Sequence, residues 1–200
     1  MEQVNYINLS YRKDRLQSFA KECSEQGISN TKRWEGVIAE PTYKGISTVH
    51  KNIIRYAKEN KMPMVCVAED DVKFCDKGAW KYFIDNIPND FDLYLAGVYC
   101  IDPILPDNRI KQFSGLILYI CHERFYDKFL SANDSKQIDR AMADLHGRYI
   151  VCNPFAAIQH EGYSDNRGRI VLDYEKKYLK NRKLYVANAE NNACTLESIH

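Results

Sequence analysis

The chain has 200 residues, which is the length of one ordinary domain, and 45% of them are hydrophobic and 28% charged, as in globular proteins. Lys and Arg number 28 against 27 Asp and Glu, and this net charge of +1 argues against a protein built to bind a polyanion such as DNA. No nucleic acid partner is therefore expected. The mean hydropathy of −0.49 and the lack of a long apolar run argue against a membrane-spanning helix. The first residues show neither the basic nor the apolar region of a signal peptide.

Seven cysteines are present, an odd number, and no two of them are spaced as C-x-x-C. Most lie within apolar strings, as Cys66 does between Val65 and Val67. We therefore expect reduced, buried thiols rather than a disulfide framework or a zinc cluster, and this favours a cytoplasmic location.

Strands and helices alternate in the first half of the chain. Residues 4–9 are β-branched and aromatic, which indicates a strand, and 14–26 have apolar positions at helical spacing before Gly27, a typical helix C-terminus. Residues 47–60 and 77–87 have the same helical spacing. The continuous apolar run 64–68 between those two helices is typical of a fully buried strand in a parallel sheet.

The second half continues this alternation. The elements expected there are strands at 92–97, 115–120 and 149–152, helices at 123–130, 136–145 and 173–183, and polar loops at 100–111 and 162–169. The whole pattern predicts an α/β fold with a mainly parallel sheet. Residues 1–187 are expected to form a single domain, and 188–200 a mobile tail.

Three acidic residues, Glu69, Asp70 and Asp71, come directly after the apolar run 64–68. In α/β proteins, ligands bind beyond the carboxyl ends of the strands, and a carboxylate cluster there suits Mg²⁺ or Mn²⁺ together with phosphate oxygens. The alternative is a solvated loop whose acids cap the next helix.

Charged residues also follow the first predicted strand, in the segment from Asn8 to Arg15. Three cations and Asp14 at a turn into a helix are typical of a nucleotide-phosphate site, because a helix N-terminus attracts anions. The alternative is a solvated first turn that Asp14 caps while Arg12 remains in water.

Four further residues are candidates for a site. Gly45 allows close backbone approach, and His50 follows one turn into the next helix, where the alternative is a packing role. His160 lies in a polar segment after a strand and could complete a metal site, or it is an exposed loop histidine. Asp139 is a possible functional carboxylate at the start of a predicted helix, or an ordinary helix-start residue.

The motifs of several large enzyme classes are absent. The sequence contains no G-x-G-x-x-G, no G-x-x-x-x-G-K-[ST], no H-E-x-x-H and no G-x-S-x-G. Dinucleotide dehydrogenases, P-loop NTPases, zincins and α/β-hydrolases are therefore disfavoured.

The order of the segments resembles glycosyltransferase family 25, the lipopolysaccharide-type galactosyltransferases and the collagen galactosyltransferase domains. The opening Tyr6–Leu9 with Arg12, Asp14 and Arg15 resembles the family's I-N-L-x-x-R-x-D-R. Further segments that resemble family motifs in the same order are Gly45–His50 (G-C-x-x-S-H), Glu69–Val72 (E-D-D-V), Asp92–Gly97 (D-x-x-Y-L-G), Leu118–Ile120 (A-Y-x-I) and Ile138–Asp139. Ile46 and Val49 stand where the family has Cys and Ser.

The resemblance implies a GT-A-like fold and an inverting transfer from a nucleotide sugar, most often UDP-galactose. It implies a divalent metal held by Asp71 with Glu69 or Asp70, and His160 is a further candidate ligand. The nucleotide-sugar site implied by it contains Asn8, Leu9, Arg12, Asp14, Arg15, Gly45, His50 and Asp70. Asp139 is the expected base for the acceptor hydroxyl, with Asp165 as the alternative.

The acceptor implied by the family is a glycan or glycolipid of the cell surface. A basic segment at 176–183 would then offer peripheral contact with the inner membrane face, unless it is a solvated helix packed on the domain. Two other functions stay open: a non-catalytic relative that binds nucleotide sugars or glycans, which the changes at Ile46 and Val49 favour, and a nucleotidyltransferase. No oligomeric state is predicted.

Overall fold

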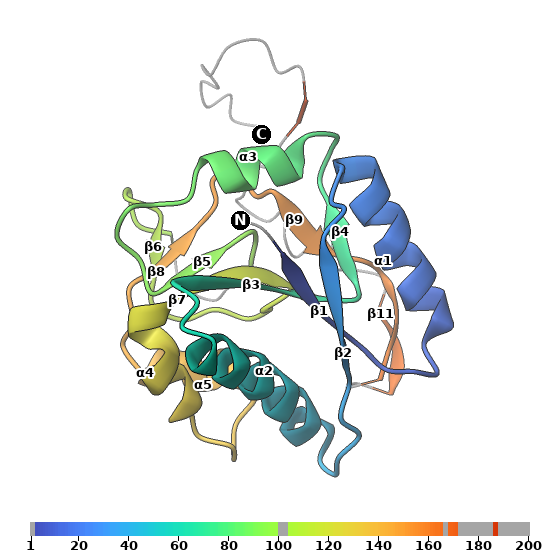
Figure 1. Ribbon diagram of the computed structural model, residues 1–200, viewed down its shortest axis with the longest axis horizontal. Coiled ribbons are helices and arrows are strands. Elements are labelled where there is room, and N and C mark those ends of the chain that lie inside the picture. The colour runs from blue at the N-terminus through green and yellow to red at the C-terminus, as the bar shows by residue number, and fades with distance from the viewer. Residues whose placement is uncertain (1–2, 100–103, 166–167, 172–185, 188–200) are drawn as a thin grey trace, which may run out of the picture.

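A computed structural model describes residues 3–99, 104–165, 168–171 and 186–187 of the chain (Figure 1). The tail 188–200, the helix expected at 173–183 and its basic residues lie outside the described residues. The five cysteines within them, Cys23, Cys66, Cys75, Cys121 and Cys152, are free thiols, and all except Cys75 are buried. Among the helices that the structure describes, none is long and apolar enough to cross a bilayer.

A seven-stranded sheet forms the centre of the molecule, in the order β2-β1-β3-β7-β5-β8-β6. Five strands run in one direction: β1 (Val4–Asn8), β2 (Thr31–Glu35), β3 (Met64–Glu69), β5 (Leu93–Leu95) and β8 (Tyr149–Val151). Two run in the opposite direction: β7 (Leu118–His122) and β6 (Arg109–Ile110). The predicted fold class, α/β with a mixed and mainly parallel sheet, is confirmed.

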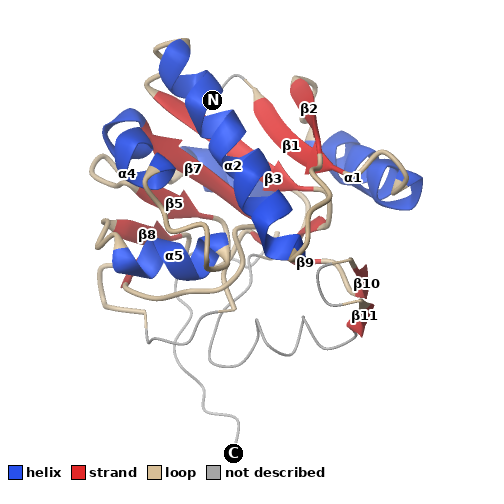
Figure 2. Ribbon diagram, turned by 90° about the horizontal axis from the view of Figure 1, so that it is seen from below, coloured by secondary structure: helices blue, strands red, loops and turns tan. Residues whose placement is uncertain are grey.

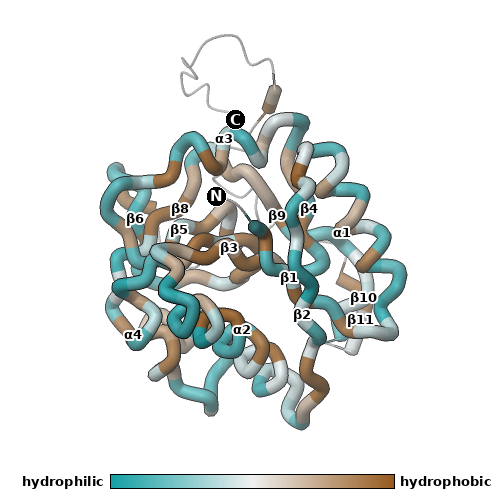
Figure 3. The backbone as a smooth tube through the Cα atoms, in the orientation of Figure 1, coloured by the Kyte–Doolittle hydropathy of each residue, from teal (hydrophilic) through white to brown (hydrophobic). Residues whose placement is uncertain are grey.

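Helices cover both faces of this sheet (Figures 1 and 2). One face carries α2 (Thr42–Glu59), α4 (Tyr126–Leu130) and α5 (Ile138–Asp144), with a short 3₁₀ turn, Glu123–Phe125, before α4. The other face carries α1 (Lys13–Gln26) and α3 (Ala79–Asp85). Because β3 lies between these two layers, Val65, Cys66 and Val67 have no exposed surface, and Figure 3 shows β3 as an apolar strand inside the molecule.

Two strand pairs lie outside the main sheet. β4 (Val72–Phe74) pairs antiparallel with β9 (Ala157–Gln159), and β10 (Gly162–Ser164) pairs antiparallel with β11 (Arg169–Val171). The second pair corrects the polar loop predicted at 162–169. Its strands lack an apolar buried face that the sequence could reveal, since Tyr163 is 48% exposed, Ile170 is 63% exposed and the buried residue of β10 is the polar Ser164.

The helix ends agree with local chemistry. α1 stops at Gly27, which has φ +70°, and the next N–H, of Ile28, donates to Cys23 O, so the predicted glycine C-terminus is confirmed. α2 begins at Thr42, directly after Pro41, rather than near residue 47 as predicted. Proline is common at helix starts, so Pro41 marks the true beginning of α2. The predicted start near 47 was too late because it was taken from the apolar positions alone.

Candidate functional site

A pocket of about 590 Å³ lies where the carboxyl ends of β1 and β3 meet the first turn of α2. β1, β2 and β3 are parallel, so their ends reach the same edge of the sheet, the usual place of ligand sites in α/β folds. Ten of the predicted site residues line it: Asn8, Leu9, Arg15, Gly45, His50, Glu69, Asp70, Asp71, Asp139 and Asp165. The topology therefore gathers residues that are far apart in the sequence.

The acidic run forms one end of the pocket. Glu69 is the last residue of β3, and Asp70 and Asp71 occupy the turn before β4, 7% and 5% exposed. Arg15 Nη1 lies 3.0 Å from a carboxylate oxygen of each aspartate, and Asn8 Nδ2 donates to Asp70 Oδ2 at 2.7 Å. These bonds favour the charged form of two carboxylates that water barely reaches.

Asp71 has one oxygen in use and one unpartnered. Gln159 Nε2 donates to Oδ2 at 2.7 Å, whereas the buried Oδ1 has no hydrogen-bond partner within the described part of the chain. Burial raises the pKa values of Asp71, Asp70 and Glu69, and neighbouring carboxylates raise them further. An additional cation at this end of the pocket would relieve that repulsion.

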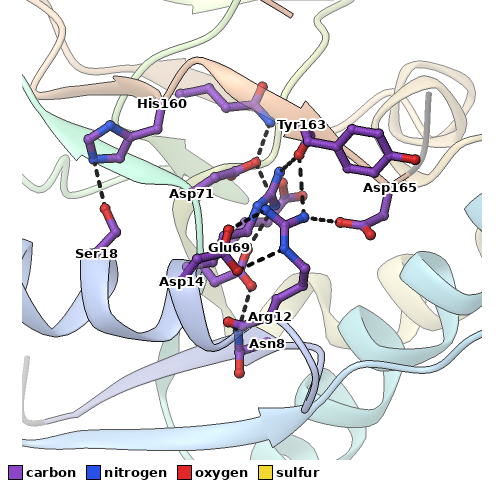
Figure 4. Close-up of polar contacts among 12 residues, drawn as sticks. Asn8, Arg12, Asp14, Ser18, Glu69, Asp71, His160, Tyr163 and Asp165 are labelled. Carbon is purple, nitrogen blue, oxygen red and sulfur yellow. Dashed lines mark hydrogen bonds and ion pairs between the residues drawn. The ribbon is translucent and has the colours of Figure 1, made fainter. Parts of the chain in front are cut away.

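His160 does not join the carboxylates, contrary to its predicted role as a metal ligand. Its Nε2 lies 3.0 Å from Glu22 Oε1 and 3.4 Å from Ser18 Oγ, on α1, and Figure 4 shows the ring beside Ser18. Side chains alternate along a strand, so Gln159, one residue earlier, reaches Asp71 instead. Across residues 3–99, 104–165, 168–171 and 186–187, no three His, Cys, Asp or Glu side chains form a metal-binding group.

Arg12 and Asp14 were also predicted in the nucleotide site, but neither lines the pocket. Arg12 pairs with Asp14 at 2.8 Å and with Asp165, and its Nη1 donates to Tyr163 O at 3.3 Å (Figure 4). Arg15 Nη2 donates to the same carbonyl at 2.8 Å. The two arginines thus hold the strand β10 against the start of α1, but only Arg15 also binds Asp70 and Asp71, whereas Arg12 binds Asp165.

The two candidate bases lie elsewhere on the wall. Asp139, in the first turn of α5, accepts from the backbone N–H groups of Gly115 (3.0 Å) and Arg140 (2.8 Å). Asp165 accepts from the Tyr11 hydroxyl at 2.9 Å and forms the ion pair with Arg12. Among the described residues, Asp139 has no ion pair, whereas Asp165 has one.

Several residues that line the pocket were not predicted from the sequence. They are Tyr11, Gln137, Gln159, Tyr163 and the segment Gly36–Glu40 after β2. Gln159 adjoins His160 in a segment that the sequence did single out, but no sequence signal distinguishes the two residues. The Gly36–Glu40 segment has no charge pattern that would indicate a binding site. It reaches the pocket because it follows β2, which pairs with β1.

Gly45 holds this segment close to α2. A Cβ atom on Gly45 would lie 1.9 Å from the carbonyl oxygen of Val37. Gly45→Ala is therefore expected to lower the free energy of unfolding by about 1–3 kcal/mol, although alanine is the better helix former. Urea unfolding measures this. Thr48→Ala, at an exposed position of the same helix, is the control and should change stability by about 0.5 kcal/mol or less; equal effects would contradict the close approach.

His50 is completely buried at the pocket wall, and burial lowers its pKa from 6.5 to about 4. The unfolded chain therefore takes up a proton at a higher pH than the folded protein does, and stability falls as the pH drops below 6.5. Between pH 7 and pH 5 this amounts to about 2 kcal/mol.

The measurement is urea unfolding at both pH values. The loss should be about 2 kcal/mol smaller in His50→Gln than in the wild type, whereas a control at the exposed His146, His146→Asn, should behave like the wild type. An unchanged pH dependence in His50→Gln would contradict the buried neutral imidazole.

No family model matches the chain, and no curated protein matches it in sequence. HddC from Yersinia pseudotuberculosis is a structural match, with a TM-score of 0.51 and 16% identity over 80% of this chain and 73% of that one. This chain shares its fold.

Two other solved structures are similar at lower scores. One is a glycosyltransferase involved in the glycosylation of the major capsid of PBCV-1, with a TM-score of 0.48 and 13% identity over 76% of this chain and 81% of that one. The other is a mutant Drosophila β-1,4-galactosyltransferase 7 in complex with manganese, UDP-Gal and xylobiose. Its TM-score is 0.46, with 7% identity over 92% of this chain and 76% of that one.

Proposed function

We propose that this protein is a glycosyltransferase that moves a sugar from a nucleotide sugar to a glycan acceptor. The observation that carries the proposal is the buried pair Asp70 and Asp71, bound by Arg15, at the carboxyl end of β3. The pair lies in a pocket of about 590 Å³, a volume in the range that small-molecule sites occupy. The motif resemblance to glycosyltransferase family 25 supports the same reading.

The leaving group in such a transfer is a nucleoside diphosphate, which needs positive charge near it. Glu69 and Asp71 would hold a divalent cation, because Asp71 Oδ1 is buried and unpartnered and Mg²⁺ is typically bound by one or two carboxylates plus substrate phosphates. When bound, the cation would neutralise charge on the phosphate oxygens. Arg15 contributes a fixed positive charge beside it, and Gln159 fixes the orientation of Asp71.

The acceptor hydroxyl must lose its proton as it attacks the sugar. We assign this step to Asp139, whose two backbone hydrogen bonds hold its carboxylate at the pocket wall without an opposing cation. Asp165 is the alternative, although Arg12 and the Tyr11 hydroxyl already bind its carboxylate.

The finer assignment rests on the resemblance. We propose UDP-galactose as donor, inversion at the anomeric carbon, a cell-surface glycan or glycolipid as acceptor, and a cytoplasmic location with possible contact at the inner membrane face. Asn8, Leu9, Gly45, His50 and Asp70 would form the donor site with Arg15, and Arg12 with Asp14 would support it from outside the pocket.

A non-catalytic relative is the second candidate, because Ile46 and Val49, which replace the family's Cys and Ser, both line the pocket. The test is release of nucleoside diphosphate from a panel of nucleotide sugars with Mn²⁺, with and without glycolipid extracts. Release that depends on the acceptor supports transfer. Binding without release favours the non-catalytic relative, and pyrophosphate formed from a sugar phosphate and a nucleoside triphosphate favours a nucleotidyltransferase.

A further inference from the structure

Two buried polar residues contact each other at the pocket: His50 of α2, which lines it, and Tyr119 of β7, which does not. Neither has exposed surface, and their rings are stacked with centroids 5.7 Å apart. His50 Nδ1 lies 2.9 Å from the Tyr119 hydroxyl, a well-formed hydrogen bond. The proposed reaction does not use Tyr119, although this polar pair is buried between helix and sheet.

The other ring nitrogen of His50 points toward the acidic end of the pocket. Nε2 is buried, lies 3.5 Å from Glu69 Oε1, and has no hydrogen-bond partner among the residues the structure describes. A buried polar nitrogen without a partner is costly and unusual. Nε2 faces Glu69, whose side chain is 27% exposed and lines the pocket, so we expect His50 to act on a ligand through Glu69.

The hydrogen bond to Tyr119 decides which nitrogen of a neutral His50 carries the proton. If Nδ1–H donated to Tyr119, the buried tyrosine O–H would lack an acceptor, because the described residues offer it no partner besides His50. If the tyrosine O–H donates to Nδ1, it is satisfied, and Nε2–H faces Glu69 as a donor.

We propose that Tyr119 is a positioning residue for the pocket: it fixes His50 in the Nε2–H form, and this N–H orients the Glu69 carboxyl group toward bound ligand. The effect of Tyr119 on nucleotide-sugar affinity rests on the proposed function. The His50 tautomer and the orientation of Glu69 do not rest on it, since both are properties of the ligand-free protein.

The first experiment records long-range ¹H–¹⁵N spectra of the ¹⁵N-histidine-labelled protein at pH 8, with His50 assigned by His50→Gln. An unprotonated Nδ1 and a protonated Nε2 are expected. The opposite pattern would overturn the proposal, and this measurement needs no variant of Tyr119.

The second experiment compares Tyr119→Phe with Tyr126→Phe, a matched control. Tyr126 is equally buried, and its hydroxyl donates to Met62 O at 3.0 Å, away from the pocket. Tyr119→Phe should shift the His50 Nδ1 signal and the side-chain carboxyl ¹³C signal of Glu69, assigned by Glu69→Gln, and Tyr126→Phe should leave both unchanged. A Glu69 signal that is the same in Tyr119→Phe and wild type would overturn the positioning role.

UDP-galactose with Mn²⁺ then tests the functional consequence. Its affinity should fall about five- to tenfold in Tyr119→Phe, the effect of one lost hydrogen bond, and stay unchanged in Tyr126→Phe. If the wild type binds no nucleotide sugar, the proposed function fails, and the two spectra still decide whether Tyr119 orients His50 and Glu69.

Discussion

Asp71→Asn is expected to lower glycosyl transfer by a factor of about 10²–10³, the usual result when one preorganised charge of a transition-state site is removed. The carboxylate is 5% exposed, its Oδ2 accepts from Gln159, and its Oδ1 is the unpartnered oxygen we assign to a cation. An amide keeps the shape but loses the charge. Metal-dependent binding of the nucleotide sugar should disappear when this charge is removed. Calorimetric titration of the variant with the nucleotide sugar, in Mn²⁺ and in EDTA, measures this binding.

Asp127→Asn is the matched control. Asp127, in α4, is 80% exposed and paired with Lys58 of α2, and it does not line the pocket. The same chemical change there should leave donor binding and turnover at the wild-type level. If Asp71→Asn retained wild-type affinity in the presence of Mn²⁺, the acidic end of the pocket would not be the donor site.

Arg15→Ala is expected to lower the free energy of unfolding by about 3–5 kcal/mol, because it leaves two buried carboxylates without their shared counter-charge. Arg15 is 20% exposed and lies 3.0 Å from both Asp70 and Asp71. Without the guanidinium the pKa values of both carboxyl groups rise further, so the folded variant binds protons more readily than its unfolded chain. Its deficit should therefore shrink as the pH falls from 7 toward 5.

Urea unfolding at the two pH values measures both effects. Arg124→Ala is the control, since Arg124 also binds two carboxylates, of Asp90 and Asp92, but is 43% exposed, and its loss should cost about 1 kcal/mol or less. Adding Asp70→Asn to Arg15→Ala should restore part of the lost stability. A loss in Arg15→Ala no larger than in Arg124→Ala would contradict the buried ion pairs.

Elements with a strong local pattern could be predicted from the sequence. α1 has its apolar stripe and Gly27, and β3 is a continuous apolar run, so both were found nearly to the residue. β2 was not predicted because it is an edge strand in which Thr31, Arg33 and Glu35 are exposed and Trp34 is the one apolar residue. β4, β9 and β10 are three residues each, too short for a periodicity to be visible.

The part of the site that could be predicted is the run of acidic residues that follows a buried strand. Glu69, Asp70 and Asp71 stand out for that reason, and they do form the acidic end of the pocket. The sequence does not show whether Gln159 or His160 contacts Asp71. That depends on the register of β9 against β4, because a shift of one residue would exchange the faces on which the two side chains lie. The different positions of Arg12 and Arg15 likewise depend on the β10 strand, which binds them from a distant part of the chain.

The central claim is that the pocket binds a nucleotide sugar at its acidic end. The most direct test is calorimetric titration of the wild-type protein with UDP-galactose, other UDP-sugars and GDP-sugars, in Mn²⁺ and in EDTA. We predict saturable binding of one of them with a dissociation constant of about 1 mM or lower, the range of ordinary enzyme substrates, that is weakened by EDTA. The absence of saturable binding by every nucleotide sugar in the presence of Mn²⁺ would contradict the account.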